Sequence, residues 1–329
     1  MARSYTGIDI GRSALKMAVC DGGRVKKLIV EPIPEGLMDD QRIVSLDAMA
    51  DFIKDVAKAN GGVAKDVAYV LQPISTLVRR LEMPLMDAKE VALNLPFEFR
   101  DFIDQGKDRY FYDYAVLGPV NNEDGQLEGM DLLACCAPKD VINDLDNMLG
   151  RAGLRLRVAL PAVAALQDIM ETGPAAGTDC CVIDLAHKAT RLHFFAKGLY
   201  DVTRTIELGG HDVDVAIADA LGVDDHTANE YKASNFQDCL QLPEVLSVFD
   251  NLAVEVTRAL NFYGFNNPQI ELSRAYCMGG GAHIQGVLDQ LAEAVHLELV
   301  PAAELLGQGE DDEQLPECAA AVGATLKAE

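Results

Sequence analysis

The chain has 329 residues, of which 49% are hydrophobic and 24% are charged. This length and apolar content suffice for two lobes with their own cores, and they exclude general disorder. The formal net charge of −24 argues against a broad contact with nucleic acid or with an anionic membrane surface, because both would repel the protein.

The first predicted element is a hairpin, and it occurs twice. Residues 9–25 (DIGRSALKMAVCDGGRV) align without gaps with residues 184–200 (DLAHKATRLHFFAKGLY). Each copy begins with an Asp that ends an apolar strand, and each contains a Gly turn, at Gly22–Gly23 and Lys197–Gly198, that is typical of a hairpin. Any two hairpins share some of these features, but the shared Asp and Gly spacing favours a duplicated α/β fold with a cleft between the copies.

Helices are predicted between and after the hairpins, because apolar residues recur there at helical spacing. In chain order the predicted helices are Ser45–Lys58, Val141–Ala152, Ala159–Met170, His211–Leu221, Pro243–Tyr263, Ile284–Ala294 and Ala319–Leu326. Gly264 is expected to break the long helix that precedes it, and the acidic stretch Gly309–Glu313 is expected to be a solvated loop.

A third feature is a glycine triplet, Gly279–Gly281, between a short strand and a predicted helix. Glycines at this position allow the backbone to approach a ligand closely and direct helix N–H groups toward it. Many such turns are merely tight connections, so the triplet alone is weak support for a binding site.

Other site chemistries find little support in the sequence. No apolar run approaches the roughly 20 residues that span a bilayer, and the N-terminus leads directly into a strand, so we expect a cytoplasmic protein without membrane insertion. The eight cysteines include no CxxC pair. Cys135–Cys136 and Cys180–Cys181 are predicted to lie in the protein core, as free thiols of a protein in a reducing compartment. None of the six histidines shows a metal or triad spacing; only His187 and His211 are expected near the cleft.

The two Asp-led hairpins and the late glycine turn resemble the signature of the actin, Hsp70 and sugar-kinase superfamily. Within it, the chain most resembles the PilM family of type IV pilus assembly proteins. The segments that carry this resemblance, in order, are Gly7–Gly11 with Leu15–Lys16, Leu81–Leu85, Leu95–Glu98, Asp113–Leu117, Ala152–Leu154, Leu208–Asp212 and Ala228–Lys232. The resemblance therefore covers nearly the whole chain.

This resemblance implies an α/β, actin-like (ribonuclease H-like) two-lobed fold with duplicated βββα units. The implied divisions are 1–35 for the first part of lobe one, 36–135 for an inserted small subdomain, 136–176 for the return to lobe one, 177–310 for lobe two, and 311–329 for a C-terminal helix that packs back on lobe one.

The resemblance also implies a function. The protein would be an assembly component that binds ATP with Mg²⁺ in the cleft. The expected partner is the cytoplasmic N-terminal peptide of a PilN-like inner-membrane pilus protein, bound beside the inserted subdomain near residues 80–118. This partner would recruit the protein to the inner face of the cytoplasmic membrane. Self-association is left open, and no nucleic acid is expected.

The resemblance also implies roles for particular residues. Asp9 and Asp184 would hold Mg²⁺ mainly through water, and Lys16 would place a positive charge near the phosphates, although it is alternatively a solvent-facing residue. The other implied nucleotide-binding positions are Gly11, Arg12, Ser13, Ala186, Thr190, Gly209, Gly210, Asn229, Lys232, Gly279, Gly280, Gly281 and Ala282. The segment that contains Asn229 and Lys232 is alternatively an exposed helix start.

One departure from the family pattern concerns hydrolysis. Ala186 replaces a glycine of the second hairpin, and its Cβ would crowd a phosphate and penalise a positive φ. Lys188 is an alternative source of charge there. We therefore expect nucleotide binding without fast hydrolysis, and no catalytic base is identified. The competing interpretations are a small-molecule kinase, for which no base Asp is apparent, and an FtsA-like protein, whose basic C-terminal membrane helix has no counterpart here.

Overall fold

The computed structural model describes residues 3–39, 42–122, 124–308 and 312–328. It divides into two compact units, the first formed by residues 1–169 and 320–329 and the second by residues 170–319. Helix α4 (Ala162–Thr172) carries the chain from the first unit into the second, and helix α10 (Leu315–Leu326) carries it back. Most of the acidic loop predicted at 309–313 lies outside the described residues.

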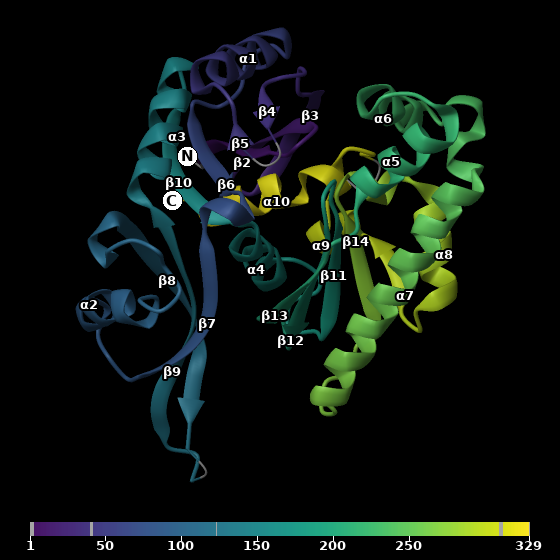
Figure 1. Ribbon diagram of the computed structural model, residues 1–329. Helices are drawn as coiled ribbons and strands as arrows, with labels where there is room; N and C mark the ends of the chain where they lie inside the picture. The colour runs from purple at the N-terminus through teal and green to yellow at the C-terminus, as the bar shows by residue number, and fades with distance from the viewer. Residues whose placement is uncertain (1–2, 40–41, 123, 309–311, 329) are drawn as a thin grey trace. The chain divides into compact units, whose positions relative to one another are not determined.

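The first unit is built on a five-stranded sheet with the order β10-β6-β1-β2-β3 (Figure 1). Its strands are β1 (Ser4–Ile10), β2 (Ala14–Asp21), β3 (Arg24–Pro32), β6 (Asp66–Leu71) and β10 (Arg155–Pro161). Strands β1 to β3 form an antiparallel meander, whereas β6 runs parallel to β1 and β10. Gly22 and Gly23 have φ values of 55° and 77° and form the turn between β2 and β3, as predicted.

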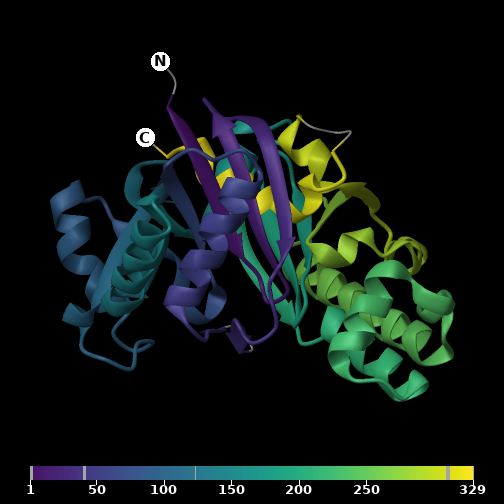
Figure 2. The same cartoon turned by 90° about the horizontal axis from the view of Figure 1, so that it is seen from above.

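Helices α1 (Leu46–Ala59) and α3 (Lys139–Arg151) pack against this sheet. Helix α1 begins close to the predicted residue because the hydroxyl of Ser45 accepts a hydrogen bond from the N–H of Ala48. Its side chains that join the core of the sheet are Met49, Ala50, Ile53 and Val56. Figure 2 shows α1 alongside the purple strands of the meander. A two-stranded hairpin, β4 (Met38–Asp39) and β5 (Arg42–Ile43), precedes the helix.

The C-terminal end of α10 approaches the first sheet so closely that only small residues fit. A Cβ added to Gly7 in β1 would overlap the backbone oxygen of Ala321, and a Cβ on Gly323 would overlap that of Ala165 in α4. Ala321 itself is completely buried. Glycine in β1 therefore allows the helix backbone to lie directly on the strand.

We expect Gly7→Ala to lower the free energy of unfolding by about 3 kcal/mol, because the new methyl group meets backbone that has no side chain to move aside. Urea unfolding followed by circular dichroism measures this difference. Gly118→Ala is the matched control, since a Cβ at Gly118 meets no atom within 4 Å. Equal stability of the two variants would show that α10 does not need the close approach.

The second unit is built on another five-stranded sheet, with the order β13-β12-β11-β14-β15. Its strands are β11 (Cys180–Leu185), β12 (Thr190–Ala196), β13 (Leu199–Ile206), β14 (Arg274–Met278) and β15 (Glu298–Pro301). Its helices are α5 (Gly210–Leu221), α6 (Asp225–Ser234), α7 (Pro243–Asn266), α8 (Gln285–Ala294) and α9 (Ala302–Leu306).

Helix α7 extends beyond its predicted end. Gly264 was expected to break the helix, but α7 continues through it to Asn266. A glycine costs a helix about 1 kcal/mol, whereas α7 buries seven side chains, among them Phe249, Leu260 and Tyr263, in the core of the second unit. The burial of this face outweighs the local preference of one glycine.

The two sheets are copies of one topology, which confirms the predicted duplication. Read from β3 and from β13, both orders are a three-stranded antiparallel meander followed by two strands that run parallel to the central strand, β1 or β11. The registers also agree, because Asp9 lies opposite Lys16 in one hairpin and Asp184 lies opposite Arg191 in the other. The fold is thus mixed α/β with a repeated sheet.

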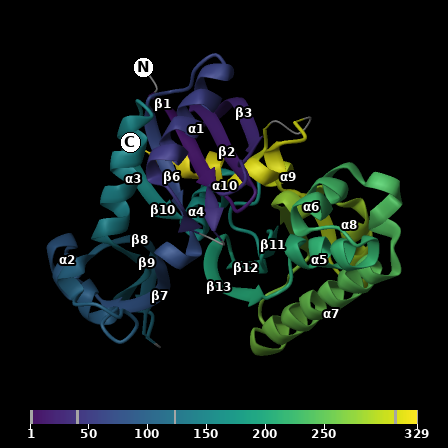
Figure 3. The same cartoon turned by 45° about the horizontal axis from the view of Figure 1, so that its top comes forward.

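A smaller three-stranded sheet forms a module of the first unit (Figure 3). Its strands, β7 (Leu77–Pro84), β9 (Leu127–Pro138) and β8 (Tyr110–Asn121), are antiparallel in that order. Helix α2 (Ala88–Glu98) packs on the sheet through Val91 and Leu95 and gives the module a separate core.

The module starts later than the predicted boundary at residue 36. Residues 36–71 contain α1 and β6, and β6 lies between β1 and β10 in the large sheet. Met38 and Met49 belong to the core of that sheet as well. The prediction was wrong for this segment because β6 is a short, continuously buried strand, whose sequence does not reveal which sheet it joins.

Candidate functional site

In the first unit, the turn after β1 brings three of the predicted site residues together. The ammonium group of Lys16 lies 3.2 Å from a carboxylate oxygen of Asp9, and both side chains are about one-fifth exposed. A Cβ on Gly11 would lie 3.5 Å from the same ammonium nitrogen. Asp9 and Lys16 thus lie beside Gly11, whose N–H donates to the carbonyl of Ala14 at 2.9 Å.

Two other predicted residues of this turn have different surroundings. The guanidinium of Arg12 donates a hydrogen bond to the carbonyl of Met38, at 2.7 Å. Ser13 is exposed, and its carbonyl accepts a hydrogen bond from the N–H of Ile33. The side chain of Arg12 therefore ties the turn to β4, and that of Ser13 remains exposed.

In the second unit, the end of β11 meets the glycine triplet. Gly279 has a φ of 85°, and a Cβ there would lie 2.7 Å from a carboxylate oxygen of Asp184 and 2.7 Å from the carbonyl of Leu185. A Cβ on Gly281 would lie equally close to the Leu185 side chain. The structure thus brings Asp184 and the triplet together, and only glycine fits at position 279. Arg191 lies 3.8 Å from Asp184, as Lys16 lies beside Asp9.

The remaining residues of the triplet are less constrained. Gly280 is exposed and would meet no atom with a Cβ, while the N–H of Ala282 donates to the carbonyl of Gly279. These residues form the short turn of Gly280–His283 that leads into α8.

The start of helix α5 is fastened to the turn between β11 and β12. The N–H groups of Gly210 and His211 donate to the carbonyls of Ala186 and His187, at 3.0 and 2.7 Å. A Cβ on Gly209 would lie 2.6 Å from both carbonyl oxygens. Gly209 is therefore required for this contact, and two N–H groups at the start of the helix are already bound within the protein.

One expectation about this turn is wrong. Ala186 does not have a positive φ, so the backbone penalty expected for replacing a glycine there is absent. Thr190 is completely buried, and its hydroxyl donates to the carbonyl of Leu208 at 2.9 Å. This hydrogen bond fixes the turn to the segment before α5.

Asn229 and Lys232 of helix α6 both contact Asp214 of helix α5. Lys232 lies 2.7 Å from one carboxylate oxygen, and the amide of Asn229 donates to the other at 3.2 Å. Lys232 also donates to the carbonyl of Gly210. Burial raises the pKa of Asp214, and Lys232 and Asn229 offset this only in part. These two residues thus hold α5 and α6 together in the structure.

A small apolar cavity lies beside the second hairpin. Its volume is about 20 Å³, and it is lined by Leu185, Ala186, Gly209, Phe249 and neighbouring residues. This volume holds about one water molecule. The cavity thus lies between the β11–β12 turn and helix α7.

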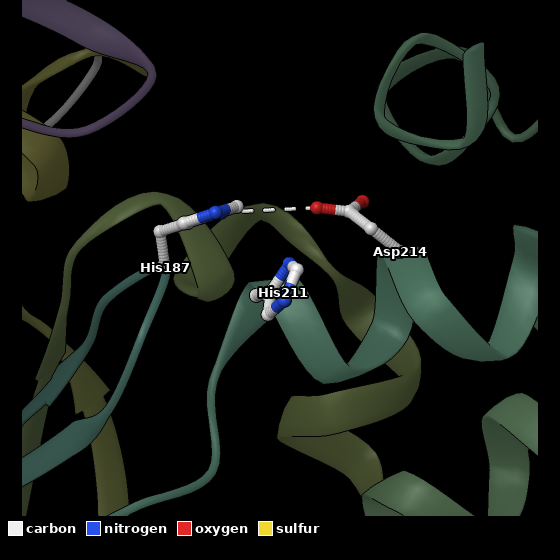
Figure 4. A group of neighbouring side chains, drawn as sticks. All are labelled: His187, His211 and Asp214. Atoms are coloured by element: carbon white, nitrogen blue, oxygen red, sulfur yellow. Dashed lines mark ion pairs between the residues drawn. The ribbon is translucent and has the colours of Figure 1, made fainter. Parts of the chain in front are cut away.

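The structure also joins the two histidines that were expected near the cleft with an aspartate that the sequence did not single out. His187, His211 and Asp214 place potential metal-ligand atoms within 4.8 Å of one another (Figure 4). His187 and His211 are 24 positions apart in the sequence, so no local spacing joins them. The available signal was His211 with Asp214 at i and i+3 on one predicted helix.

The two units repeat one local arrangement of charged groups. Each unit places one partly exposed Asp at the end of its first strand, with a cation on the next strand and glycine beside it. Carboxylate oxygens that are not fully desolvated are suitable water-mediated ligands for Mg²⁺.

Within the described residues, no helix has the length and apolar character needed to cross a bilayer.

Comparisons with known proteins agree with this architecture. The family model of type IV pilus assembly protein PilM matches residues 7–306. A solved PilM-PilN type IV pilus biogenesis complex is similar over 98% of each chain, with 24% identity and a TM-score of 0.81. The comparison with curated proteins gave no match.

Two other solved structures share the actin-like fold. The ethanolamine utilization protein EutJ from Carboxydothermus hydrogenoformans has 14% identity and a TM-score of 0.61, over 99% of this chain and 89% of that one. MreB5 of Spiroplasma citri bound to ADP has 12% identity and a TM-score of 0.52, over 98% and 94%. The α/β actin-like fold expected from the sequence is therefore confirmed.

Proposed function

This chain belongs to the PilM family of type IV pilus assembly proteins, and we propose that it is a nucleotide-binding component of the pilus assembly platform. In this role it binds ATP with Mg²⁺ and holds the cytoplasmic N-terminal peptide of a PilN-like inner-membrane protein. The peptide recruits it to the inner face of the cytoplasmic membrane. It acts as a scaffold more than as an enzyme.

The repeated Asp and cation pair is the observation that carries the nucleotide part of the proposal. Asp9 with Lys16 and Asp184 with Arg191 occupy equivalent register positions in two copies of one sheet. A structural salt bridge would not require the adjoining glycines, yet Gly279 accommodates Asp184 only because it lacks a Cβ. The similar MreB5 structure contains ADP, which supports the same ligand class for this chain.

In the proposed site, the chain's own residues bind and orient the phosphates. Asp9 and Asp184 would hold Mg²⁺ through water, Lys16 would contribute a point charge, and the glycines at positions 11 and 279 would permit close approach. The ion would supply charge neutralisation for the phosphates. Arg191, which occupies the register position equivalent to that of Lys16, is a further cation of the proposed site.

The partner part of the proposal rests on the small module. Seven of the sixteen large apolar side chains exposed among the described residues lie between residues 85 and 127. They are Leu85, Leu93, Phe97, Phe102, Phe111, Val116 and Leu127. Exposed apolar side chains gathered on a small module are typical of a protein contact, and the solved relative is a complex of PilM with PilN.

We expect purified protein to bind ATP in a magnesium-dependent manner, and Asp184→Ala to weaken binding at least tenfold because a metal-water contact is lost. Isothermal titration calorimetry measures the affinity, and Asp250→Ala, at an exposed position of α7, is the control.

Phosphate release should stay far below several turnovers per second, in wild type and in Ala186→Gly. Rapid turnover by the wild type would contradict the scaffold role.

A further inference from the structure

The cluster of His187, His211 and Asp214 has no role in the proposed function. His187 lies in the turn between β11 and β12, while His211 and Asp214 lie in the first turns of α5. The backbone hydrogen bond from His211 to the carbonyl of His187 fixes the two segments against each other. The cluster is thus held by secondary structure on both sides.

The side chains converge on a common point, as Figure 4 shows. Nδ1 of His187 lies 3.7 Å from Oδ2 of Asp214, and the centroids of the two imidazole rings are 5.4 Å apart. Ligand atoms around one tetrahedral zinc ion are roughly 3.3 Å apart, given metal–ligand distances near 2.0–2.1 Å. The three atoms lie within 4.8 Å of one another, so modest side-chain rotations would bring them to that spacing.

Asp214 presents one of its two carboxylate oxygens to the cluster. The residue is 1% exposed. Lys232 approaches Oδ1, whereas Oδ2 accepts a hydrogen bond from the amide of Asn229 and faces His187. Oδ2 is therefore the oxygen positioned to share an ion with the His187 imidazole.

We propose that His187, His211 and Asp214 form a binding site for one divalent transition-metal ion of the zinc class. Two imidazole nitrogens and one carboxylate oxygen suit Zn²⁺, Co²⁺ or Ni²⁺, whereas Mg²⁺ prefers oxygen ligands alone. Three protein ligands leave a fourth position for water. A bound ion would lock the β11–β12 turn to helix α5.

Cysteine is the main competing ligand in this chain, and the structure argues against it. Burial raises the pKa of the Cys180, Cys181 and Cys277 thiols, and a metal needs the thiolate. Cobalt distinguishes the two cases, because thiolate ligands give Co²⁺ intense charge-transfer absorption that nitrogen and oxygen ligands do not.

The test is calorimetric titration of the full-length, nucleotide-free protein with Zn²⁺, repeated with Co²⁺ and read by absorption. We expect one ion per chain, and at least tenfold weaker binding in His187→Ala and in His211→Ala, since loss of a ligand costs at least as much as loss of a supporting residue. His226→Ala is the matched control, because His226 lies 3.9 Å from a carboxylate of Glu230 but outside the cluster.

A second measurement separates binding from folding. Zn²⁺ should raise the melting temperature of the wild type and of His226→Ala, but not of the two cluster variants. The imidazole of His187 is partly exposed, so we expect its truncation to leave the fold intact. Three results would each overturn the proposal, whatever the outcome for ATP binding. They are the absence of saturable zinc binding, zinc binding that persists when His187→Ala and His211→Ala are combined, and a thiolate spectrum with Co²⁺.

Discussion

Replacement of Gly279 by alanine is expected to abolish detectable ATP binding. Its φ of 85° disfavours any residue with a Cβ, and the new methyl group would lie 2.7 Å from the carboxylate of Asp184. Asp184 or the glycine turn must then move, and both are proposed to contact the nucleotide. We expect affinity to fall at least a hundredfold, equivalent to about 2.8 kcal/mol.

Isothermal titration calorimetry with MgATP measures this loss. Gly264→Ala is the matched control, because it introduces the same methyl group in the same unit where no atom lies within 4 Å. Circular dichroism of both variants shows whether the second sheet remains folded. A folded Gly279→Ala protein with wild-type affinity would remove the glycine turn and Asp184 from the proposed nucleotide site.

Removal of the small module is expected to abolish membrane recruitment in cells. The structure sets where this deletion must begin, because a deletion from residue 36 would remove strand β6 from the large sheet. Leu77 pairs with Cys136, and the hydroxyl of Thr76 donates to the carbonyl of Cys136. The two ends of the module are therefore neighbours, and a short glycine–serine linker can join Thr76 to Lys139.

The rest of the first unit should survive this deletion. The module has its own core around Leu95, Phe99 and Leu132, and the core of the five-stranded sheet takes the small side chain of Ala137 from the deleted segment. A finer test compares Phe111→Asp in β8 with Phe265→Asp in α7, since both side chains are exposed, at 48% and 86%. Only the first should lose recruitment, and normal recruitment of the module deletion would refute the proposed partner surface.

The sequence predicted the duplicated hairpins correctly because their signal is local. Asp, Gly and strand length repeat at fixed spacing, and the structure pairs Asp9 with Lys16 and Asp184 with Arg191 in the same register. The start of helix α1 was predictable for the same reason, since Ser45 is a capping residue followed by apolar side chains at helical spacing.

The features that the sequence did not predict depend on contacts between distant segments. The sequence of β6 is typical of a buried strand, but its pairing with β1 depends on tertiary structure that the local sequence does not specify. The hydrogen bond from the Thr190 hydroxyl to the carbonyl of Leu208 joins residues 18 positions apart. His187 and His211 meet only because α5 is fastened to the β11–β12 turn. Roles that depend on such contacts cannot be assigned from residue type and spacing alone.

Binding of the partner peptide tests the central claim most directly. The measurement is a calorimetric titration of the full-length protein with a synthetic peptide that spans the cytoplasmic N-terminus of the PilN-like protein from the same organism. We predict saturable binding of one peptide per chain, weakened at least tenfold by Phe111→Asp and unchanged by Phe265→Asp. A folded protein that binds no peptide, with or without MgATP, would contradict the account.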